Sequence, residues 1–365
     1  MITSDEMNQE LQTRFAHIKR WHAPQFSLWK RVFAMPYLRT NGQKIHWGNV
    51  KSATDATIVV WGSTIVEYAS SDQVYRMEDG FIHSLGLGSD LSPPCSQVID
   101  TTGIYFDAQR DNDLFKLLNS TVFDTALLER AANLRRMIVD AGITKYNLGR
   151  KAVSWQRPVH QRVILVVGQV ADDASVRLGA TGAIASIEQL LEHVWQENSD
   201  AMIVYKPHPD VLSGNRIGLV QAEQLCHIVD VDADIVSLLE QVDEVHTLSS
   251  LVGFDALLRG KKVVTYGLPF YAGWGLTEDE IVNIPYRSRA VNLDMLVAAA
   301  LILYSTYWDW QKMQFTTPEA TVSQLVAGAS RPLVNMHPVK RALLKTLRWC
   351  RNLVKFLYLT VFIKI

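Results

Sequence analysis

The sequence predicts an α/β protein of two domains, one of which is built on a parallel, doubly wound sheet. Four short runs rich in Val and Ile alternate with helical patterns: VILVVGQ (163–169), AMIVYKP (201–207), HIVDV (227–231) and KVVTYG (262–267). This alternation is typical of parallel strands that are connected by helices. The chain has 365 residues, more than one hydrophobic core usually serves, which favours a second domain.

The remaining elements follow in chain order. The first 50 residues have a helical pattern with a proline break, and TIVVWG (57–62) is a short apolar run ending at glycine, typical of a buried strand. IASIEQLLEHVWQ (184–196) is a helical pattern between two of the later strands. The polar stretch 145–161 predicts a boundary between an N-terminal domain, 1–155, and a C-terminal domain, 156–330. With an α/β half on each side, we expect a ligand cleft at the strand carboxyl ends.

Composition excludes several classes of protein. The formal net charge of -1 excludes a chain-wide basic field for nucleic acid. The three cysteines (Cys95, Cys226 and Cys350) are widely spaced without a CxxC pair, so neither a disulfide framework nor a cysteine metal site is indicated. The N-terminus has no signal-peptide pattern, and no apolar run reaches the roughly 18 residues that suggest a membrane span. We therefore expect an intracellular protein.

Candidate ligand-binding side chains follow the run AMIVY, in KPHPD (206–210). Its two prolines fix an extended turn in which His208 is held out from the strand end, beside the Lys206 cation. The motif fits two interpretations, a ligand site and a rigid loop with a structural histidine.

A serine pair, Ser249 and Ser250, separates DEVHT (243–247) from the helical pattern LVGFDALLRG (251–260). One interpretation is a helix N-cap. The other is a phosphate site, in which two hydroxyls and the positive helix end bind the anion.

Two pairs of adjacent carboxylates complete the set. Asp172 and Asp173 follow a predicted strand in GQVADDAS (168–175), and Glu78 and Asp79 precede a glycine in RMEDGF (76–81). Each pair alone is typical of solvated loop residues or helix caps.

Together the four motifs resemble those of the bacterial capsule-polysaccharide β-Kdo transferases, where Kdo is 3-deoxy-D-manno-oct-2-ulosonic acid. The resemblance rests on RMEDGFIHSLGLGSDLSPP (76–94), GQVADDASVRLG (168–179), YKPHPD (205–210) and HTLSSLVGFDALLRGKKVVTYGLPFYAGWGLTED (246–279). It is weak or absent before residue 50 and after about residue 320. It implies a GT-B-like glycosyltransferase, with two Rossmann-like domains facing a cleft, that takes Kdo from CMP-β-Kdo and retains the β configuration.

Retention by double displacement needs two carboxyl roles. The resemblance implies that Asp173 is the nucleophile, with its neighbour Asp172 as the alternative. The acid-acid-glycine turn resembles the motif by which bacterial sialyltransferases position their catalytic base. It implies that Glu78 is the acid/base group, with Asp79 as the alternative.

The CMP leaving group needs partners for its developing negative charge, and His208 is implied in this catalytic role. The residues that the resemblance implies for binding CMP-Kdo are Gln169, Lys206, His208, Pro209, Ser249, Ser250, Tyr271 and Trp274. In GLPFYAGWGLTED (267–279), the glycines would let the backbone approach the ligand while the rings form sugar or base walls; a packed corner is the alternative. Hydrogen bonds and a helix end suffice for one phosphate, and no His/Asp/Glu cluster has metal-ligand spacing, so neither a metal nor another cofactor is expected.

The tail, residues 331–365, contains eight Lys or Arg residues and no Asp or Glu. If this tail is helical, apolar and basic residues lie on opposite sides of the helix. The apolar stripe is Leu343, Leu347, Cys350, Val354 and Leu357, and the basic side is Arg341, Lys345, Arg348 and Lys355. This predicts a basic amphipathic helix that lies on an anionic membrane surface. The alternative is a closing helix whose stripe packs on the protein's own core.

The expected partners are CMP-Kdo, a saccharide or lipid-linked acceptor and an anionic membrane surface, but not nucleic acid. We expect a cytoplasmic enzyme, peripheral on the inner face of the cytoplasmic membrane. Two other functions fit the motifs: transfer of another CMP-activated 2-keto sugar acid, such as sialic acid, and a non-catalytic CMP-sugar-binding subunit of an assembly complex.

The chain departs from the family pattern in two ways. It holds one module where capsule-linker enzymes often carry two, which leaves the acceptor and linkage open. His83 stands where the related pattern usually has an arginine. If that arginine binds the Kdo carboxylate, we expect a lower donor affinity here.

Overall fold

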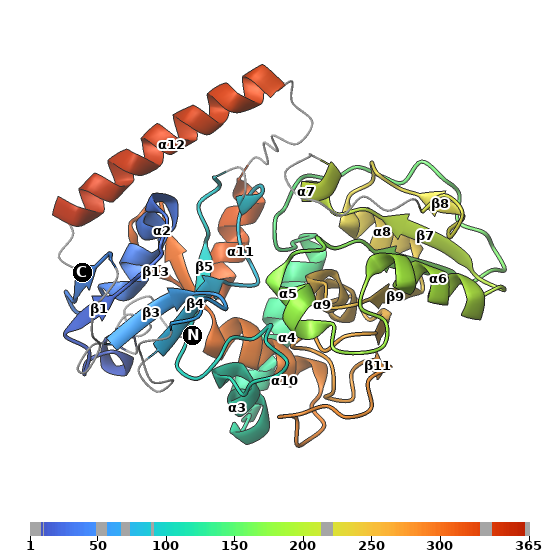
Figure 1. Cartoon of the computed structure of the whole chain (residues 1–365), viewed down its shortest axis with the longest axis horizontal. Helices are drawn as coiled ribbons and strands as arrows, with labels where there is room; N and C mark the ends of the chain where they lie inside the picture. The colour runs from blue at the N-terminus through green and yellow to red at the C-terminus, as the bar shows by residue number, and fades with distance from the viewer. Residues whose placement is uncertain are drawn as a thin grey trace.

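The computed structural model describes residue 9 and residues 11–48, 57–66, 74–88, 91–212, 222–328 and 338–361. The chain forms two α/β lobes, each built around one β-sheet, with further helices between the sheets (Figure 1).

The first lobe has a seven-stranded mixed sheet in the order β13-β12-β5-β4-β3-β1-β2. Its strands are β1 (Arg20–His22), β2 (Lys44–His46), β3 (Thr57–Trp61), β4 (Val74–Asp79), β5 (Ser96–Asp100), β12 (Thr306–Asp309) and β13 (Gln314–Thr316). The neighbours from β2 to β4 pair in parallel, whereas β5, β12 and β13 pair antiparallel. The expectation of a second Rossmann-like sheet is therefore met only in part. The chain returns from Gly80 to Ser96 without an intervening α-helix among its described residues, so β5 pairs antiparallel with β4.

The N-terminal region is less helical than expected. Helix α2 (Leu28–Leu38) is capped by Ser27, whose side chain accepts the N–H of Lys30, and it contains Pro36. The strands β1 and β2 flank this helix and were not predicted. Each has three residues, too few to show an alternating pattern.

The second lobe has a six-stranded sheet in the order β11-β10-β9-β6-β7-β8, and every neighbouring pair is parallel. Its strands are β6 (Val163–Val167), β7 (Met202–Lys206), β8 (Ile228–Val229), β9 (Glu244–Thr247), β10 (Lys262–Thr265) and β11 (Glu278–Asp279). Each of the four predicted Val/Ile-rich runs contains one of these strands. The strand order reverses between β6 and β9, which creates the crevice where doubly wound folds bind ligands.

Short helices connect the strands of the second lobe: α5 (Ala174–Gly179), α6 (Ile187–Glu197), α7 (Pro209–Leu212), α8 (Ile235–Gln241) and α9 (Leu251–Leu258). The predicted helix in 184–196 is α6. Ser186 and Gln189 form a capping box at its start, and the buried side of the helix consists of Ile187, Leu190, Leu191 and Val194.

The lobes are joined by helices packed between the sheets (Figure 1). These are α3 (Asp113–Ser120), α4 (Thr125–Asp140), α10 (Leu293–Val297), the π-helical η3 (Ala298–Tyr304) and α11 (Pro318–Ala327). Arg135 of α4 is paired with Asp294 of α10, and Arg130 with Glu319 of α11, at 2.8 and 2.7 Å. After η3 the chain re-enters the first sheet. Residues 306–316, which the sequence places in the C-terminal domain, therefore extend the first sheet: β12 pairs with β5, and β13 pairs with β12.

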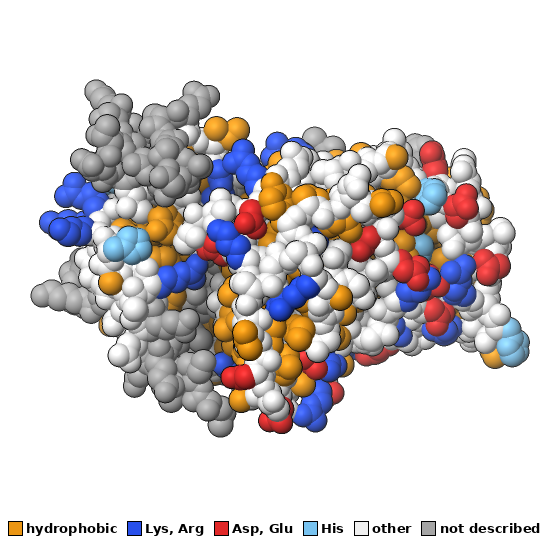
Figure 2. Space-filling view, turned by 90° about the horizontal axis from the view of Figure 1, so that it is seen from below, with side chains coloured by type: hydrophobic (Ala, Val, Ile, Leu, Met, Phe, Trp, Pro, Cys, Tyr) orange, Lys and Arg blue, Asp and Glu red, His pale blue; other side chains and the backbone are white. Residues whose placement is uncertain are grey.

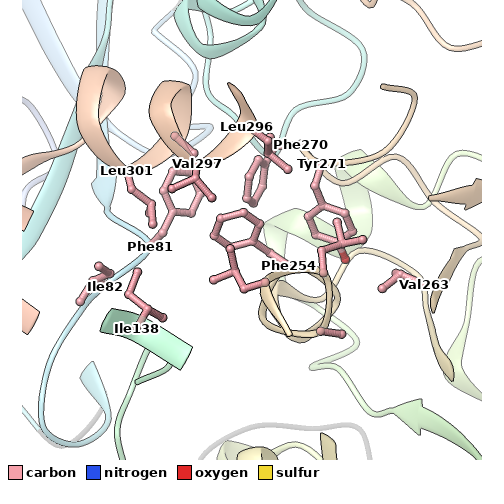
Figure 3. Packing of buried hydrophobic residues seen from close by; sticks show 14 of the residues in the cluster. Phe81, Ile82, Ile138, Phe254, Val263, Phe270, Tyr271, Leu296, Val297 and Leu301 are labelled. Atoms are coloured by element: carbon pink, nitrogen blue, oxygen red, sulfur yellow. The ribbon is translucent and has the colours of Figure 1, made fainter. Parts of the chain in front are cut away.

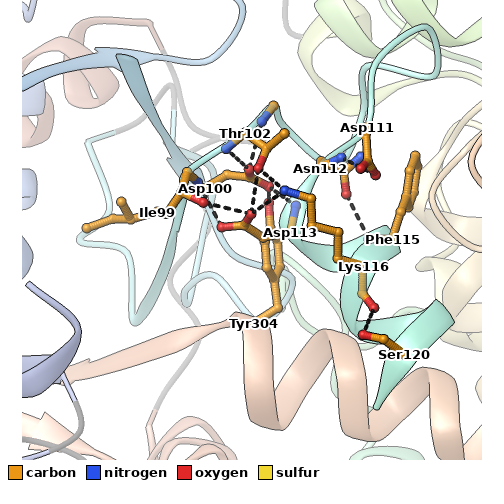
Figure 4. Close-up of polar contacts among 12 residues, drawn as sticks. Ile99, Asp100, Thr102, Asp111, Asn112, Asp113, Phe115, Lys116, Ser120 and Tyr304 are labelled. Carbon is orange, nitrogen blue, oxygen red and sulfur yellow. Dashed lines mark hydrogen bonds and ion pairs between the residues drawn. The ribbon is translucent and has the colours of Figure 1, made fainter. Parts of the chain in front are cut away.

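A buried polar network fixes α3 and η3 to the end of β5 (Figure 4). Asp100 accepts the N–H groups of Thr102 and Gly103 through Oδ1, and the N–H of Asp113 and the hydroxyl of Tyr304 through Oδ2, all at 2.8–3.0 Å. This aspartate therefore has a structural role, because all four donors belong to neighbouring elements.

Helix α12 (Pro338–Val361) lies along the first lobe beside α2 (Figure 1). Its inward side is polar as well as apolar: Asn352 and Leu359 are buried, and Nζ of Lys355 lies 5.1 Å from the centroid of the Trp310 ring. The predicted apolar stripe points the other way, and Leu343, Leu347, Val354 and Leu357 are all more than half exposed. Arg331 and Lys364 of the predicted tail lie outside the described residues, as does the side chain of Arg341.

The surface of the second lobe carries charges of both signs. Acidic and basic side chains are interspersed on the face that Figure 2 shows, in keeping with the formal net charge of -1.

Candidate active site

A cavity of about 1050 Å³ lies between the two lobes. It is lined by the ends of β4, β6 and β7, by the start of α9 and by the connection 141–151. All four sequence motifs contribute side chains to it: Glu78, Asp79, Gln169, Asp173, Lys206, His208, Ser249 and Ser250. Its size is at the upper end of the usual range for ligand sites, about 300–1,000 Å³.

Glu78 and Asp79 are the last residues of β4, and the chain turns directly afterwards. A side chain at Gly80 would collide with Ser96, so the turn requires glycine. Oε1 of Glu78 accepts the N–H of Asp79 at 3.0 Å. Burial, reinforced by the charge of Asp79, raises the pKa of Glu78 to about 7. A carboxylate with this pKa can act as a general base near neutral pH.

The pKa of Asp79 is shifted in the opposite direction to that of Glu78. Burial disfavours its charged form, but His83, Lys145 and Lys30 together hold the pKa of Asp79 below its ordinary value. Nε2 of His83 lies 3.1 Å from Oδ2 of Asp79, and His83 is only 2% exposed. Glu78 is thus the better proton acceptor of the pair, while Asp79 remains an anchored anion.

Asp173 lines the cavity and also caps α5. Its Oδ1 accepts the N–H of Ser175 at 2.9 Å and the hydroxyl of Ser175 at 2.7 Å. These two bonds fix the carboxylate at the start of the helix, where the helix dipole favours its negative charge. Its neighbour Asp172 is exposed and does not line the cavity. The geometry therefore favours Asp173 over Asp172 as the residue that meets a ligand.

Gln169 links the ends of β6 and β9, the two strands between which the strand order reverses. Its Oε1 accepts the N–H of Ser249 at 2.9 Å, and its Nε2 donates to Oγ of Ser249 at 3.1 Å. Ser249 in turn donates to the carbonyl of Ser175, so the serine loop is tied to the Asp173 loop. Ser250 caps α9 by accepting the N–H of Val252 at 3.3 Å. The helix-cap interpretation of the serine pair is therefore confirmed for Ser250, and the pair also lines the cavity, whereas the phosphate site stays a prediction.

Lys206 is the last residue of β7, and His208 follows it in the predicted turn. Nδ1 of His208 accepts the N–H of Asp210 at 3.1 Å, which leaves the proton of a neutral ring on Nε2. Burial lowers the pKa of Lys206, although nearby aspartates, Asp230 foremost, oppose the shift. The backbone of Pro209 starts α7, and its side chain lies outside the described residues.

Tyr271 and Trp274 do not line the cavity, so the prediction that their rings form ligand walls is wrong. Both are fully buried, and Tyr271 packs beside Phe254 and Phe270 (Figure 3). The hydroxyl of Tyr271 donates to the carbonyl of Ser250, and Nε1 of Trp274 donates to the carbonyl of Phe270. These rings support the serine loop from behind. Phe270 is the ring of this segment that reaches the cavity wall.

The cavity residues that were not predicted include Lys145, Tyr146 and Asp255. Lys145 and Tyr146 belong to the connection between the lobes, which we had interpreted only as a boundary. Asp255 is on α9, where burial raises its pKa to about 7. A carboxylate inside the apolar pattern LVGFDALL was the available sequence signal for it. Among the described residues, no group of three or more His, Cys, Asp or Glu side chains could hold a metal ion.

Curated relatives share most of this chain. The capsule polysaccharide modification protein LipA of Neisseria meningitidis serogroup B is 42% identical over 315 residues, which cover 82% of this chain and 44% of LipA. The lipopolysaccharide-processing protein LpsZ of Rhizobium meliloti is 41% identical over 292 residues, which cover 75% of this chain and 65% of LpsZ. The chain thus spans less than half the length of LipA.

Two solved structures have a similar fold. One is Thermosulfurimonas dismutans KpsC, beta Kdo 2,4 transferase, with a TM-score of 0.76 and 28% identity over 85% of this chain and 99% of that one. The other is Thermosulfurimonas dismutans KpsC, beta Kdo 2,7 transferase, with a TM-score of 0.69 and 34% identity over 84% of this chain and 99% of that one.

The family described as capsule polysaccharide biosynthesis protein matches residues 57–307, which include the second lobe, part of the first lobe and every residue of the cavity motifs. With the identity to LipA and LpsZ, this match shows that the chain belongs to the capsule polysaccharide biosynthesis protein family.

Proposed function

We propose that this chain is a GT-B-like, retaining glycosyltransferase that moves Kdo from CMP-β-Kdo to a saccharide or glycolipid acceptor in surface polysaccharide biosynthesis. One observation carries the proposal: a single cavity is lined by Asp173 from one lobe and by Glu78 from the other. Retaining transfer through a covalent intermediate needs two such carboxyl groups. The likeness to two KpsC β-Kdo transferases supports the choice of Kdo as the sugar.

In the first step, a carboxylate oxygen of Asp173 attacks the anomeric carbon C2 of Kdo, and the bond from C2 to the phosphate oxygen breaks. CMP leaves with the bonding electrons as a dianion. Nε2–H of His208, the Lys206 ammonium and the Ser250 hydroxyl are the groups on this side of the cavity that stabilise the charge.

In the second step, Glu78 removes the proton of an acceptor hydroxyl. The acceptor oxygen then attacks C2 from the face that CMP left, and the bond between C2 and Asp173 breaks. Two inversions give net retention. The pKa of about 7 suits Glu78 to this proton transfer near neutral pH.

The test is incubation with CMP-Kdo, CMP-sialic acid and a panel of synthetic acceptors, with release of CMP measured and the product linkage determined by NMR. We expect CMP release and a β-linked product with CMP-Kdo only. Preference for CMP-sialic acid would assign the chain to another 2-keto sugar acid. CMP binding without turnover of either donor would indicate a non-catalytic subunit.

We further propose that the enzyme works at the inner face of the cytoplasmic membrane, with α12 as the contact. The outward side of this helix exposes Leu343, Leu347, Val354 and Leu357, with exposed fractions of 55–65%. Residues 338–361 contain Lys and Arg but no Asp or Glu, so the helix complements anionic lipid. No described helix is long and apolar enough to cross a membrane.

A further inference from the structure

The connection between the lobes holds one lysine at a fixed position in the cavity wall. The backbone carbonyl of Lys145 accepts the N–H groups of His83 and Ser84 at 3.0 and 3.1 Å. Asn147 has a φ of 48°, and its side chain bonds both the N–H and the carbonyl of Thr144 at 2.9 and 2.8 Å. The backbone around Lys145 is therefore anchored to the chain that follows Glu78 and Asp79.

Four cationic side chains line the cavity: Lys145, Arg150, Lys151 and Lys206. Arg150 and Lys151 form ion pairs with carboxylates of the second lobe. Within the described part of the chain, neither Lys145 nor Lys206 donates a side-chain hydrogen bond or forms a direct ion pair. Two ammonium groups are thus available for an anionic ligand.

The two free lysines lie on different sides of the cavity. Lys206 ends β7 in the second lobe, close to the groups proposed for the phosphate. Nζ of Lys145 lies 5.5 Å from the centroid of the Tyr146 ring. Burial disfavours the ammonium form, but Tyr146, Tyr105 and the carboxylates of β4 raise the pKa of Lys145 above its ordinary value. Lys145 therefore remains a cation.

The loop that carries Lys145 lines the same cavity as the two proposed catalytic carboxylates, and the charges of both motifs act on it. Burial raises the pKa of Tyr146, Lys145 opposes this shift, and the charges of Asp79 and Asp173 add to it. Tyr146 is thus within electrostatic range of both carboxylate motifs, although they come from different lobes.

Stereochemistry then decides which anion meets this loop. In CMP-activated 2-keto sugar acids, the phosphate and the carboxylate are attached to the same carbon. During displacement the nucleophile and the leaving phosphate lie on opposite sides of that carbon, so the carboxylate points sideways to their axis. The loop of Lys145 lines the same cavity as Asp173 and Glu78, and its backbone is bonded to the chain that follows Glu78. We propose that Lys145 binds the carboxylate of the donor sugar acid, an inference that rests on the function proposed above.

The experiment compares CMP, which lacks this carboxylate, with CMP-Kdo. Lys145→Met and Lys145→Gln remove the charge, Lys145→Arg keeps it, and Lys312→Met is the control at an exposed position outside the cavity. Thermal melting verifies that each variant is folded. Calorimetry gives the Kd of CMP, and steady-state transfer gives KM and kcat for CMP-Kdo over a range of pH.

We expect the neutral variants to bind CMP as the wild type does and to raise KM for CMP-Kdo about 10–100-fold, the effect of losing one hydrogen bond between charged groups. Lys145→Arg should recover most of this loss. Equal weakening of CMP and CMP-Kdo would overturn the inference, because Lys145 would then bind phosphate. A shifted pH profile with unchanged KM would also overturn it, since Lys145 would then act only on the pKa of Glu78. A wild-type protein that binds neither compound would instead reject the proposed function, and this subsite with it.

Discussion

Nε2 of His83 lies 3.1 Å from Oδ2 of Asp79, so a buried imidazole holds the carboxylate next to the proposed base. His83 faces Asp79 rather than the cavity. Its contribution to a ligand is therefore indirect: it keeps Asp79 charged, and that charge helps to raise the pKa of Glu78. The contact between His83 and Asp79 thus acts indirectly on the protonation equilibrium of Glu78, the preceding residue.

The pH dependence of transfer should report the pKa of Glu78. Because the base must be deprotonated, kcat/KM should rise about tenfold per pH unit below pH 7 and level off above it. Asp79→Asn removes a neighbouring negative charge that raises this pKa, so the midpoint should move to lower pH.

Glu78→Gln should depress kcat by roughly 10²–10⁴-fold and abolish the acidic limb of the pH profile. Glu129→Gln, at an exposed position of α4, is the control. A wild-type midpoint that survives in Glu78→Gln would assign the base to another residue.

Glu78→Gln should also stabilise the protein at alkaline pH. The pKa of Glu78 is raised from 4.5 to about 7 on folding, so the folded state binds more protons than the unfolded state between these values. The free energy of unfolding of the wild type therefore falls as pH rises through this window. The shift corresponds to about 3 kcal/mol, which the glutamine variant should regain above pH 7 and not below pH 4. Chemical denaturation of both proteins at pH 4 and pH 8 measures the difference in their free energies of unfolding. The same difference at both pH values would contradict the burial argument.

The sequence was most informative for strands that a local pattern of residues predicts without reference to distant segments. The strands β6, β7 and β10 are apolar runs of four or five residues with turn signals after them, so their positions were predictable. The ends of β6 and β7 were predictable for the same reason, and polar side chains that follow these two strands line the cavity.

The features that were missed depend on contacts between distant segments. Strand β12 comes from the second half of the chain and pairs with β5, β13 pairs with β12, and no local pattern specifies these partners. Tyr271 and Trp274 are aromatic residues among glycines, a pattern that fits a ligand wall as well as a packed corner. Tyr271 packs so closely on α9 that a side chain at Gly253 would collide with the Tyr271 ring, so this segment is a packed corner. Lys145 lies in a segment without helix or strand periodicity, and only the fold brings it to Glu78.

Asp173 has two roles that one substitution can separate. It caps α5, and an asparagine retains the capping oxygen but cannot act as a nucleophile. Asp173→Asn should therefore melt as the wild type does and lose turnover, whereas Asp173→Ala should also lose about 1 kcal/mol of stability. Mass spectrometry of the wild type mixed with CMP-Kdo should find a Kdo adduct on the peptide that contains Asp173. Asp172→Asn is the matched control, since this carboxylate is exposed and outside the cavity. Near-normal turnover of Asp173→Asn would remove Asp173 from the mechanism.

His208 should distinguish CMP from cytidine. If Nε2–H donates to the phosphate, His208→Ala weakens CMP by about 1.5–3 kcal/mol, or 10–100-fold in Kd, and leaves cytidine unchanged. His160→Ala, at an exposed position outside the cavity, should affect neither ligand. Calorimetry with the two compounds is the measurement. Equal weakening of both would mean that His208 only shapes the turn through its bond to Asp210.

The outward stripe of α12 gives the last prediction. The helix contacts the first lobe along one side only: Asn352 and Leu359 are buried, whereas Leu347 and Val354 are 57% and 65% exposed. Charged residues at these two outward positions should therefore leave folding intact but oppose burial in lipid. We expect the wild type to sediment with anionic vesicles, less at high salt, and Leu347→Glu/Val354→Glu to remain in the supernatant with unchanged melting temperature and unchanged transfer to soluble acceptors. The matched control is Val122→Glu/Val282→Glu, which adds the same charge at positions 89% and 91% exposed elsewhere on the surface. The two variants have the same net charge, so loss of sedimentation in both would reflect charge alone. Unchanged sedimentation of the α12 variant would mean that this helix does not contact the membrane.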